Sequence, residues 1–347
     1  MMLLKRWAQF VLNVRQHHWT AIPLDHRGLI RVSGEDTTKF LQGLITNDVE
    51  FLKSTGAIYS MLLNARGRIL YDMLLYNPDH AQTSVLIEVS QSAVNEFLRL
   101  LRTYKLRKQV EMENVTSVYR IWSLFSPKTS CSTVITNDDL RESLQMKTRR
   151  GLVFSHTDPR HPSLGIRMIT HHSTKVETLT DLCQVSTDLS MYKRWLYGNG
   201  IAEGVEDIPP GDCIPLEYNI VFLNGVSFNK GCYIGQELVA RTHHTGVIRK
   251  RLMPIRIDNY QEFNKHFHEK TTDITIINEE TKRRAGKLRT SIDQYGIGVV
   301  RLNEWKNKLR IENANIYLRP SIPLWWPPLD EATQAEMKLE TVQIDSS

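Results

Sequence analysis

The sequence has few cysteines and no paired cysteine motif. Four occur in 347 residues, and none stands in a Cys-x-x-Cys spacing: Cys131, Cys183, Cys213 and Cys232. This excludes a small secreted scaffold held by disulfides, and it offers no zinc or dithiol redox motif. So low a cysteine content in a long chain is typical of a protein from a reducing compartment.

A membrane-length apolar run and a strong charge of either sign are also absent. The net charge is +6, from 44 basic and 38 acidic residues. The short basic clusters, Arg249 to Arg251 and Arg283-Arg284, have no interleaved aromatic stripe, so solvated strand ends explain them better than a nucleic-acid surface. The sequence therefore predicts no membrane span. It also argues against nucleic acid as a partner, so RNA binding is the weakest of the functions considered for this chain.

The first 18 residues contain no acid and carry Lys5, Arg6 and Arg15 among apolar residues. An amphipathic, basic and acid-free start is typical of a mitochondrial presequence. We therefore predict a presequence over residues 1–18 and a location in the mitochondrial matrix. The alternative is an ordinary N-terminal helix.

What the sequence does contain is a mixture of short strand and helix patterns. Short runs rich in apolar and β-forming residues predict strands at 57–63, 69–76 and 119–125, and apolar residues at helical spacing predict a helix from Val94 to about Leu106. Residues 19–245 therefore read as an α+β region of two subdomains, joined by a turn-rich connection at 126–150. Short, closely spaced strands at 246–328 predict a small C-terminal β-barrel, and residues 329–347 a frayed tail.

The chemically densest stretch is Asn229–Arg241, which holds a thiol, a cation, two glycines, an amide, a carboxylate and an arginine. A helix is predicted from Gln236 to Gly246, so Cys232 lies just before its N-terminus. The helix dipole and the nearby Lys230 favour the thiolate, which is the form that acts as nucleophile or metal ligand. The alternative is a buried, inert cysteine.

The string Lys-Gly-Cys-Tyr-x-Gly-Gln-Glu-x-x-x-Arg, from Lys230 to Arg241, resembles the signature of the YgfZ-type iron–sulfur cluster assembly factors. These are folate-binding-fold relatives of the aminomethyltransferase (T-protein) of the glycine cleavage system. Segment 40–49 and the string from Asp158 to Arg167 are similar to the same family, and Arg160 in that string either contacts an anion or pairs with Asp158. The resemblance covers about residues 25–302 and implies a GcvT/YgfZ-like α+β fold, with mixed sheets and helices plus a small C-terminal β-barrel.

The resemblance also implies a function. It predicts a mitochondrial factor for the maturation of four-iron–four-sulfur proteins, with A-type carrier proteins and the recipient proteins as partners. Cys232 would be the working thiol and the ligand of a transient iron or iron–sulfur cluster. Because such clusters usually take four thiolates, the remaining ligands must come from a partner or a second copy.

The predicted catalytic site comprises seven residues of the string: Lys230, Gly231, Cys232, Gly235, Gln236, Glu237 and Arg241. In this interpretation Lys230 offsets the charge of the thiolate, and the two glycines let the cluster of the partner approach. The amide and the carboxylate fix the loop, and the arginine pairs with the carboxylate four residues before it.

Tetrahydrofolate is the second ligand that the resemblance suggests. The implied contacts are Asn64 in a hairpin turn, Asp72 in the strand after it, and Glu217, whose position in T-protein relatives faces the folate. For Asp72 and Glu217 purely structural roles are the alternative; Asp72 would then pair with Arg66 or Arg68.

The sequence differs from the T-protein pattern at one position that matters for enzymatic activity. T-proteins carry two adjacent acids after the hairpin glycine, and here the pair is Tyr71-Asp72. A phenol is neutral near pH 7 and cannot serve as a carboxylate base. A folate-dependent one-carbon transferase therefore remains the alternative function, and the sequence leaves open whether the protein is an enzyme.

Overall fold

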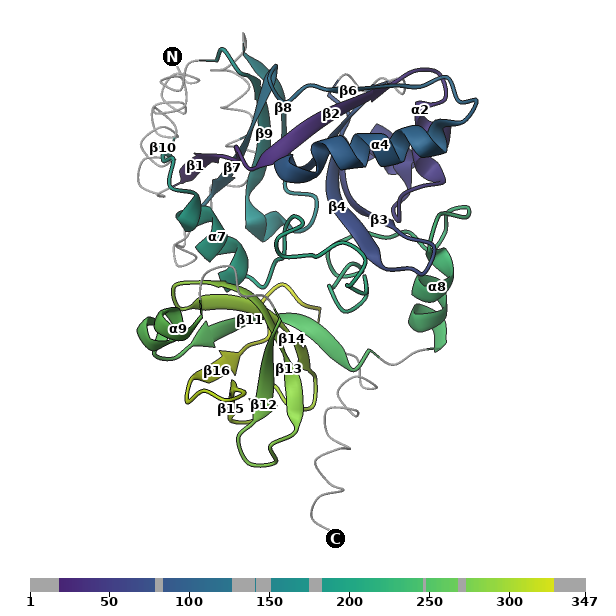
Figure 1. Ribbon diagram of the computed structural model, residues 1–347. Helices are drawn as coiled ribbons and strands as arrows, with labels where there is room; N and C mark the ends of the chain where they lie inside the picture. Colours follow the sequence, from purple (N-terminus) through teal and green to yellow (C-terminus); the bar gives the residue numbers. More distant parts are fainter. Residues whose placement is uncertain are drawn as a thin grey trace, which may run out of the picture. The chain divides into compact units, whose positions relative to one another are not determined.

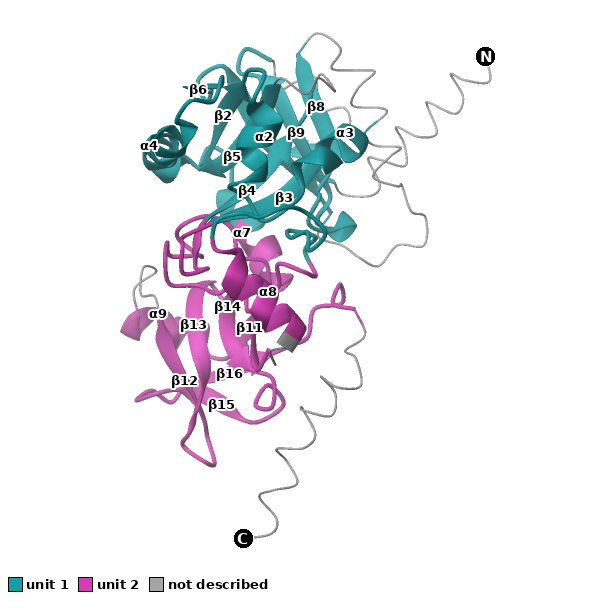
Figure 2. Ribbon diagram, turned by 90° about the vertical axis from the view of Figure 1, so that its right-hand side faces the viewer, with its two compact units in different colours: residues 1–62, 71–192, 223–234 teal, residues 63–70, 193–222, 235–347 magenta. Residues whose placement is uncertain are grey.

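The computed structural model describes residues 19–78, 84–126, 141, 151–174, 183–245, 248–267 and 273–327. The predicted presequence, most of the 126–150 connection and the predicted tail lie outside the described residues. The chain divides into two compact units, coloured separately in Figure 2. Unit 1 comprises residues 1–62, 71–192 and 223–234, and unit 2 comprises residues 63–70, 193–222 and 235–347. The predicted boundary near residue 246 remains a prediction.

The first sheet has the strand order β3-β4-β5-β2-β6. Its strands are β2 (Arg27–Ser33), β3 (Ala57–Leu63), β4 (Ile69–Tyr76), β5 (Ser84–Ser90) and β6 (Glu111–Asn114). Helix α4 (Val94–Lys105) lies across a face of this sheet in Figure 1. It buries four residues of the predicted apolar stripe, Val94, Phe97, Leu98 and Leu101. Leu106, which the prediction also considered, follows the helix and is exposed. Three short helical segments lie between β2 and β3: α2 (Thr37–Gln42), η1 (Val49–Phe51) and α3 (Leu52–Thr55).

The second sheet of unit 1 has the order β10-β1-β7-β9-β8. Its strands are β1 (Thr20–Pro23), β7 (Tyr119–Phe125), β8 (Leu152–Thr157), β9 (Ile166–His171) and β10 (Gln184–Val185). Its core cluster consists of Trp19, Ala21, Trp122, Leu124, Ile166, Met168 and Cys183. The sequence predicted β7 but not β1, β8 or β10.

A network of buried charges connects the two sheets of unit 1. Arg27 Nε donates to Glu88 Oε1 at 2.8 Å, and Arg167 Nη1 lies 3.7 Å from the same oxygen. Arg167 Nε is 3.4 Å from Asp158 Oδ2, which also accepts from Arg160 Nη2 at 2.8 Å. A buried charge without a partner costs several kcal/mol, so these groups stabilise the fold only as a paired set. Of the two roles considered for Arg160, pairing with Asp158 is confirmed.

Unit 2 contains the closed barrel that the sequence predicted, and its strand order is β11-β14-β13-β12-β15-β16. Its strands are β11 (Lys250–Ile257), β12 (Ile274–Asn278), β13 (Arg284–Ile292), β14 (Tyr295–Arg301), β15 (Leu309–Ile311) and β16 (Tyr317–Pro320). Every strand contributes a buried apolar side chain: Leu252, Ile276, Leu288, Val300, Ile311 and Leu318. Helix α9 (Tyr260–His266) follows β11; α7 (Leu189–Gly198) and α8 (Gln236–Thr245) precede the barrel in the chain. Within the described ranges, no helix is both long and apolar enough to cross a membrane.

Candidate functional site

Cys232 lies on an irregular loop and is exposed to solvent. The other two cysteines in the described part of the chain, Cys183 and Cys213, are buried. Burial raises the pKa of the Cys183 thiol to about 12, and burial likewise raises the pKa of Cys213. Accessibility therefore distinguishes Cys232 from the other two described cysteines. The alternative of a buried cysteine at this position is wrong, and the reactivity of the thiol stays a prediction.

Lys230 anchors the loop that carries this thiol. Its Nζ donates to the carbonyl oxygens of Ile45 and Asn47, at 2.7 Å each, and lies 5.1 Å from the centroid of the Tyr233 ring. Burial lowers the pKa of Lys230 to about 8, although Asp48 acts in the opposite direction. The ammonium group therefore positions the loop. Its predicted role as a countercharge for the thiolate stays a prediction.

Thr46 and Asn47 hold the chain that leads into the loop. Thr46 Oγ1 donates to the carbonyl oxygen of Gly225 at 2.6 Å, and Asn47 Nδ2 donates to that of Asn224 at 2.8 Å. The backbone N–H of Ser227 donates to the Thr46 carbonyl oxygen at 3.1 Å. Segment 40–49, which the resemblance singled out, thus holds the chain just before the cysteine string. Only the bonds from Thr46 and Asn47 to residues 224–227 were not predictable, because their partners are distant in the sequence.

The two glycines of the string have different surroundings. A Cβ built on Gly231 would meet no atom within 4 Å. Gly235 has a φ of +78°, and a Cβ there would lie 2.5 Å from the carbonyl oxygen of Asn64 and 3.0 Å from the Cα of Gly67. Gly235 is therefore required by close backbone packing within unit 2, whereas Gly231 leaves open space beside Cys232 in the chain.

Helix α8 begins at Gln236, as predicted, directly after the left-handed Gly235. Glu237 lies in its first turn and is exposed, and Arg241 is exposed one turn later. A carboxylate at the first turn of a helix interacts favourably with the helix dipole. The predicted functional roles of these three side chains, including the ion pair between Glu237 and Arg241, stay predictions.

Asn64 shapes the hairpin turn between β3 and β4. Its Oδ1 accepts hydrogen bonds from the backbone N–H groups of Arg66, at 2.9 Å, and Arg68, at 3.1 Å. Gly67 completes the turn with a φ of +74°. This is the usual local hydrogen bonding of an Asx turn, so the side-chain oxygen is engaged in the turn.

Asp72 and Tyr71 point to opposite faces of β4, because side chains alternate along a strand. Asp72 is 3% exposed, and its Oδ2 lies 3.6 Å from Arg27 Nη2, a partner that the sequence did not suggest. The Tyr71 ring packs edge-on against Phe97 of α4, with the centroids 5.2 Å apart. Burial and then Glu96 raise the pKa of Tyr71. A side chain at position 71 therefore faces the helix, and Asp72 faces the buried charges.

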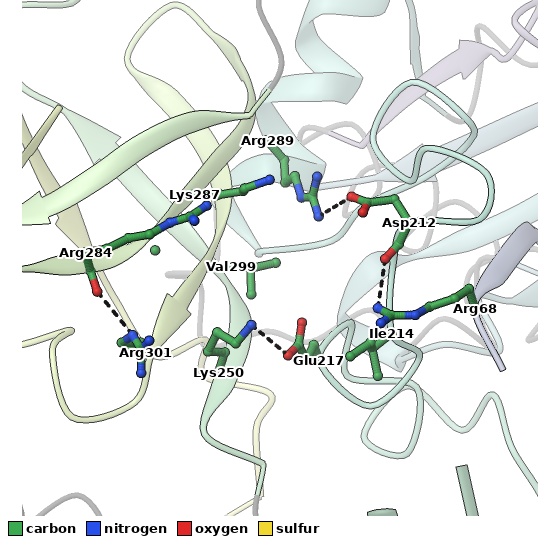
Figure 3. Close-up of a pocket in the computed structure, with 11 residues that line it drawn as sticks. Arg68, Asp212, Ile214, Glu217, Lys250, Arg284, Lys287, Arg289, Val299 and Arg301 are labelled. Carbon is green, nitrogen blue, oxygen red and sulfur yellow. Dashed lines mark hydrogen bonds and ion pairs between the residues drawn. The ribbon is translucent and has the colours of Figure 1, made fainter. Parts of the chain in front are cut away.

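Glu217 lines a cavity of about 340 Å³ in unit 2, shown in Figure 3. Its Oε1 lies 3.1 Å from the Nζ of Lys250 on β11. The lining side chains are predominantly basic, and none of the described residues that line the cavity is aromatic. Glu217 therefore lies in a predominantly basic cavity that has no aromatic side chain among its described lining residues.

The three predicted folate contacts are each engaged inside the protein, in a turn, a buried ion pair and a surface ion pair respectively. Their predicted role in binding folate stays a prediction. Among the described residues, no three His, Cys, Asp or Glu side chains gather closely enough to hold a metal ion.

Comparisons with known proteins agree with the fold. Residues 6–143 match the family described as the GCVT N-terminal domain, and residues 249–328 match the C-terminal β-barrel domain of CAF17. The crystal structure of glycine cleavage system aminomethyltransferase T from Bartonella henselae is similar, with a TM-score of 0.64. That match covers 90% of this chain and 89% of the other at 16% sequence identity, so it shows the fold alone. The predicted GcvT-like fold with a C-terminal barrel is confirmed.

Curated relatives carry the family assignment. The mitochondrial iron–sulfur cluster assembly factor IBA57 of Mus musculus is 35% identical over 89% of this chain and 86% of its own length. The human protein of the same name is 34% identical over 90% of this chain and 87% of its own. A homologue from Dictyostelium discoideum, also named as mitochondrial, is 33% identical over 67% of this chain and 62% of its own. The chain therefore belongs to the family of mitochondrial iron–sulfur cluster assembly factors named IBA57.

Proposed function

We propose that this protein acts in the mitochondrial matrix as an assembly factor for four-iron–four-sulfur proteins, with Cys232 as its working group. The observation that carries the proposal is the exposed thiol on a loop held from inside by Lys230. The names of the relatives, iron–sulfur cluster assembly factors, supply the reaction class. A fixed backbone beside an accessible thiol can present that thiol to a partner without a large ordering cost on binding.

In this proposal Cys232 ligates iron of a cluster that arrives on an A-type carrier. The cluster is cargo, and Cys232 supplies one of the thiolates that it needs while the carrier or the recipient supplies the others. Ligand exchange of this kind requires deprotonation of the thiol as the sulfur binds iron. A methyl group added to Gly231 would have no neighbour within 4 Å, which leaves room for the partner's cluster next to the thiol.

The test is cluster transfer with purified proteins. An A-type carrier loaded with a cluster is mixed with the wild-type protein or with the Cys232→Ser variant. Visible absorbance and iron content of the separated complex are then measured. We expect the variant to retain no cluster above the level of the carrier alone, because serine is a much poorer ligand for iron than a thiolate.

Cys131→Ser is the matched control, since it removes one thiol and leaves Cys232 in place. It should transfer clusters like the wild type. In mitochondria, Cys232→Ser should lower the cluster content of four-iron–four-sulfur enzymes. Normal cluster content with that variant as the sole copy would refute the proposal.

A folate-dependent one-carbon transferase is the alternative, and its support is the GcvT-like fold. The buried ion pair of Asp72 with Arg27 counts against a free catalytic carboxylate at that position. Titration with tetrahydrofolate separates the two functions. Turnover of a one-carbon donor would favour the transferase, and binding without turnover would make folate an accessory ligand of the assembly factor.

A further inference from the structure

The basic cavity of unit 2 is built mainly by three barrel strands. Lys250 comes from β11, Arg301 from β14, and three further basic residues lie along β13: Arg284, Lys287 and Arg289. Figure 3 shows these side chains arranged around one hollow, with Arg68 at its other side. A volume of about 340 Å³ is sufficient for a small molecule.

The charges around this cavity do not balance. Six cationic side chains line it against two carboxylates, Asp212 and Glu217. Asp273 pairs with two of the cations from outside the lining, which leaves an excess of three positive charges. Lys250 and Arg301 stand directly opposite each other in the antiparallel β11–β14 ladder. Like charges in that position repel. Glu217 Oε1 lies 3.1 Å from Lys250 Nζ and offsets part of this repulsion, so an anion would be favoured chiefly beside Arg301.

Some of the cations are already paired inside the protein. Arg289 forms ion pairs with Asp212, at 2.9 Å, and with Asp273. Lys287 lies 3.2 Å from Asp273. Arg284 and Arg301 differ, because in the described part of the chain neither forms an ion pair. The Arg301 side chain instead donates a 3.1 Å hydrogen bond from Nε to the Arg284 carbonyl oxygen.

We propose that this cavity binds a small, multiply charged anion, with the guanidinium groups of Arg284 and Arg301 as its main contacts and Lys250 and Lys287 beside them. Guanidinium groups present paired donors that match the oxygens of a phosphate or a carboxylate. Because Lys250 already pairs with Glu217, such an anion would chiefly offset the charges of Arg284 and Arg301.

The lining defines the ligand class. Ile214 and Val299 are the apolar side chains there, and no aromatic ring of a described residue lines the cavity. Nucleobases and other flat rings bind proteins largely by stacking on aromatic side chains, which this cavity does not offer. The ligand is therefore a hydrophilic phosphate ester or a compound with several carboxylates. This inference does not depend on the proposed function of Cys232.

Calorimetric titration of the full-length protein with pyrophosphate and, separately, with citrate tests the proposal at constant ionic strength. We expect one binding site. Substitution of both guanidinium groups, Arg284→Gln with Arg301→Gln, should lower the association constant by about tenfold or more, because charge-assisted hydrogen bonds are lost. Binding of pyrophosphate alone would identify a phosphate ligand, and binding of citrate alone a carboxylate ligand.

A matched control removes two positive charges from another part of unit 2. Lys306 and Lys308 lie against the rings of Trp305 and Tyr317, outside this cavity. The double variant Lys306→Gln with Lys308→Gln should bind within about twofold of the wild type, since distant surface charges are screened. Circular dichroism of both double variants confirms that they are folded.

Three results would overturn the proposal. The first is that neither pyrophosphate nor citrate binds the wild type. The second is an equal loss of binding in the control variant, which would show a general charge effect. The third is binding of an RNA oligonucleotide without binding of either small anion, which would make the basic surface a nucleic-acid site.

Discussion

At the scale of single residues, the two glycines beside Cys232 separate a structural role from a functional one. Gly235 has a φ of +78°, and an added Cβ would lie 2.5 Å from a backbone oxygen, whereas Gly231 has open space around it. We expect Gly235→Ala to lower the free energy of unfolding by about 2 kcal/mol or more, because the left-handed backbone and the close contact both disfavour a side chain. Gly231→Ala should change it by less than about 0.5 kcal/mol. Chemical denaturation measures both.

The functional half of this prediction concerns Gly231. If the open space beside Gly231 admits the partner's cluster, Gly231→Ala should slow cluster transfer, while the protein remains as stable as the wild type. Transfer at the wild-type rate in this variant would show that the space has no role. A large loss of stability would instead show that the neighbourhood of Gly231 is more closely packed than the structure indicates.

At the scale of elements, Asp158 is the acid that joins β9 to its preceding turn through Arg160 and Arg167. Burial would raise the pKa of Asp158, but Arg160 and then Arg167 outweigh it and hold the pKa below its usual 3.8. A depressed pKa in the folded state means that the charged carboxylate stabilises the fold above about pH 3.8 and that this stabilisation is lost as pH falls further.

We therefore expect Asp158→Asn to destabilise the protein by about 3–5 kcal/mol at pH 7, because two buried guanidinium groups lose a charged partner. The gap to the wild type should narrow as the pH falls below 3.8. Denaturation series at several pH values measure this gap. Glu50→Gln is the control, since Glu50 pairs with Lys53 on the surface and should cost little at any pH. A gap that stays constant as the pH falls well below 3.8 would contradict the assigned linkage.

The elements also show what local sequence can predict. The limits of β3, β4 and β7 agree with the sequence prediction, because each is a long apolar run bounded by turn residues. Strand β1 was missed: it has four residues, ends in a proline, and exists through its pairing with β7, about a hundred residues away. Strand β8 is half-exposed and shows little alternation. Short strands that depend on distant partners leave too little local pattern to be recognised.

At the scale of the whole molecule, contacts between distant segments are also what the sequence could not predict for the Cys232 loop. The string around Cys232 could be recognised from sequence, and its exposure fits the prediction. The carbonyl partners of Lys230 lie 185 and 183 residues away in sequence, and no local pattern indicates them. The basic cavity depends equally on the barrel register, which places Lys250 opposite Arg301. Chemistry carried by one segment was predictable, and chemistry assembled from several segments was not.

The barrel provides a test of how the chain is divided, because it shares hydrogen bonds with residues 193–222 of the same unit. The backbone N–H of Leu252 donates to the Glu217 carbonyl oxygen at 2.8 Å, and Asn219 Nδ2 donates to the Leu252 carbonyl oxygen at 2.9 Å. Trp325 Nε1 donates to the Asn199 carbonyl oxygen at 2.7 Å. These bonds join β11 and the chain after β16 to a segment that the sequence prediction placed in another domain.

Two fragments decide whether the barrel folds by itself. Residues 246–328 contain all six strands, and residues 193–328 add the segment that hydrogen-bonds to them. We expect the shorter fragment to be less stable by more than about 3 kcal/mol, because several hydrogen bonds at about 1 kcal/mol each are lost and the apolar surface beneath them is exposed. Thermal unfolding followed by circular dichroism measures the difference. Equal stability of the two fragments would mean that the barrel folds without residues 193–222. The boundary near residue 246 would then be a true domain boundary.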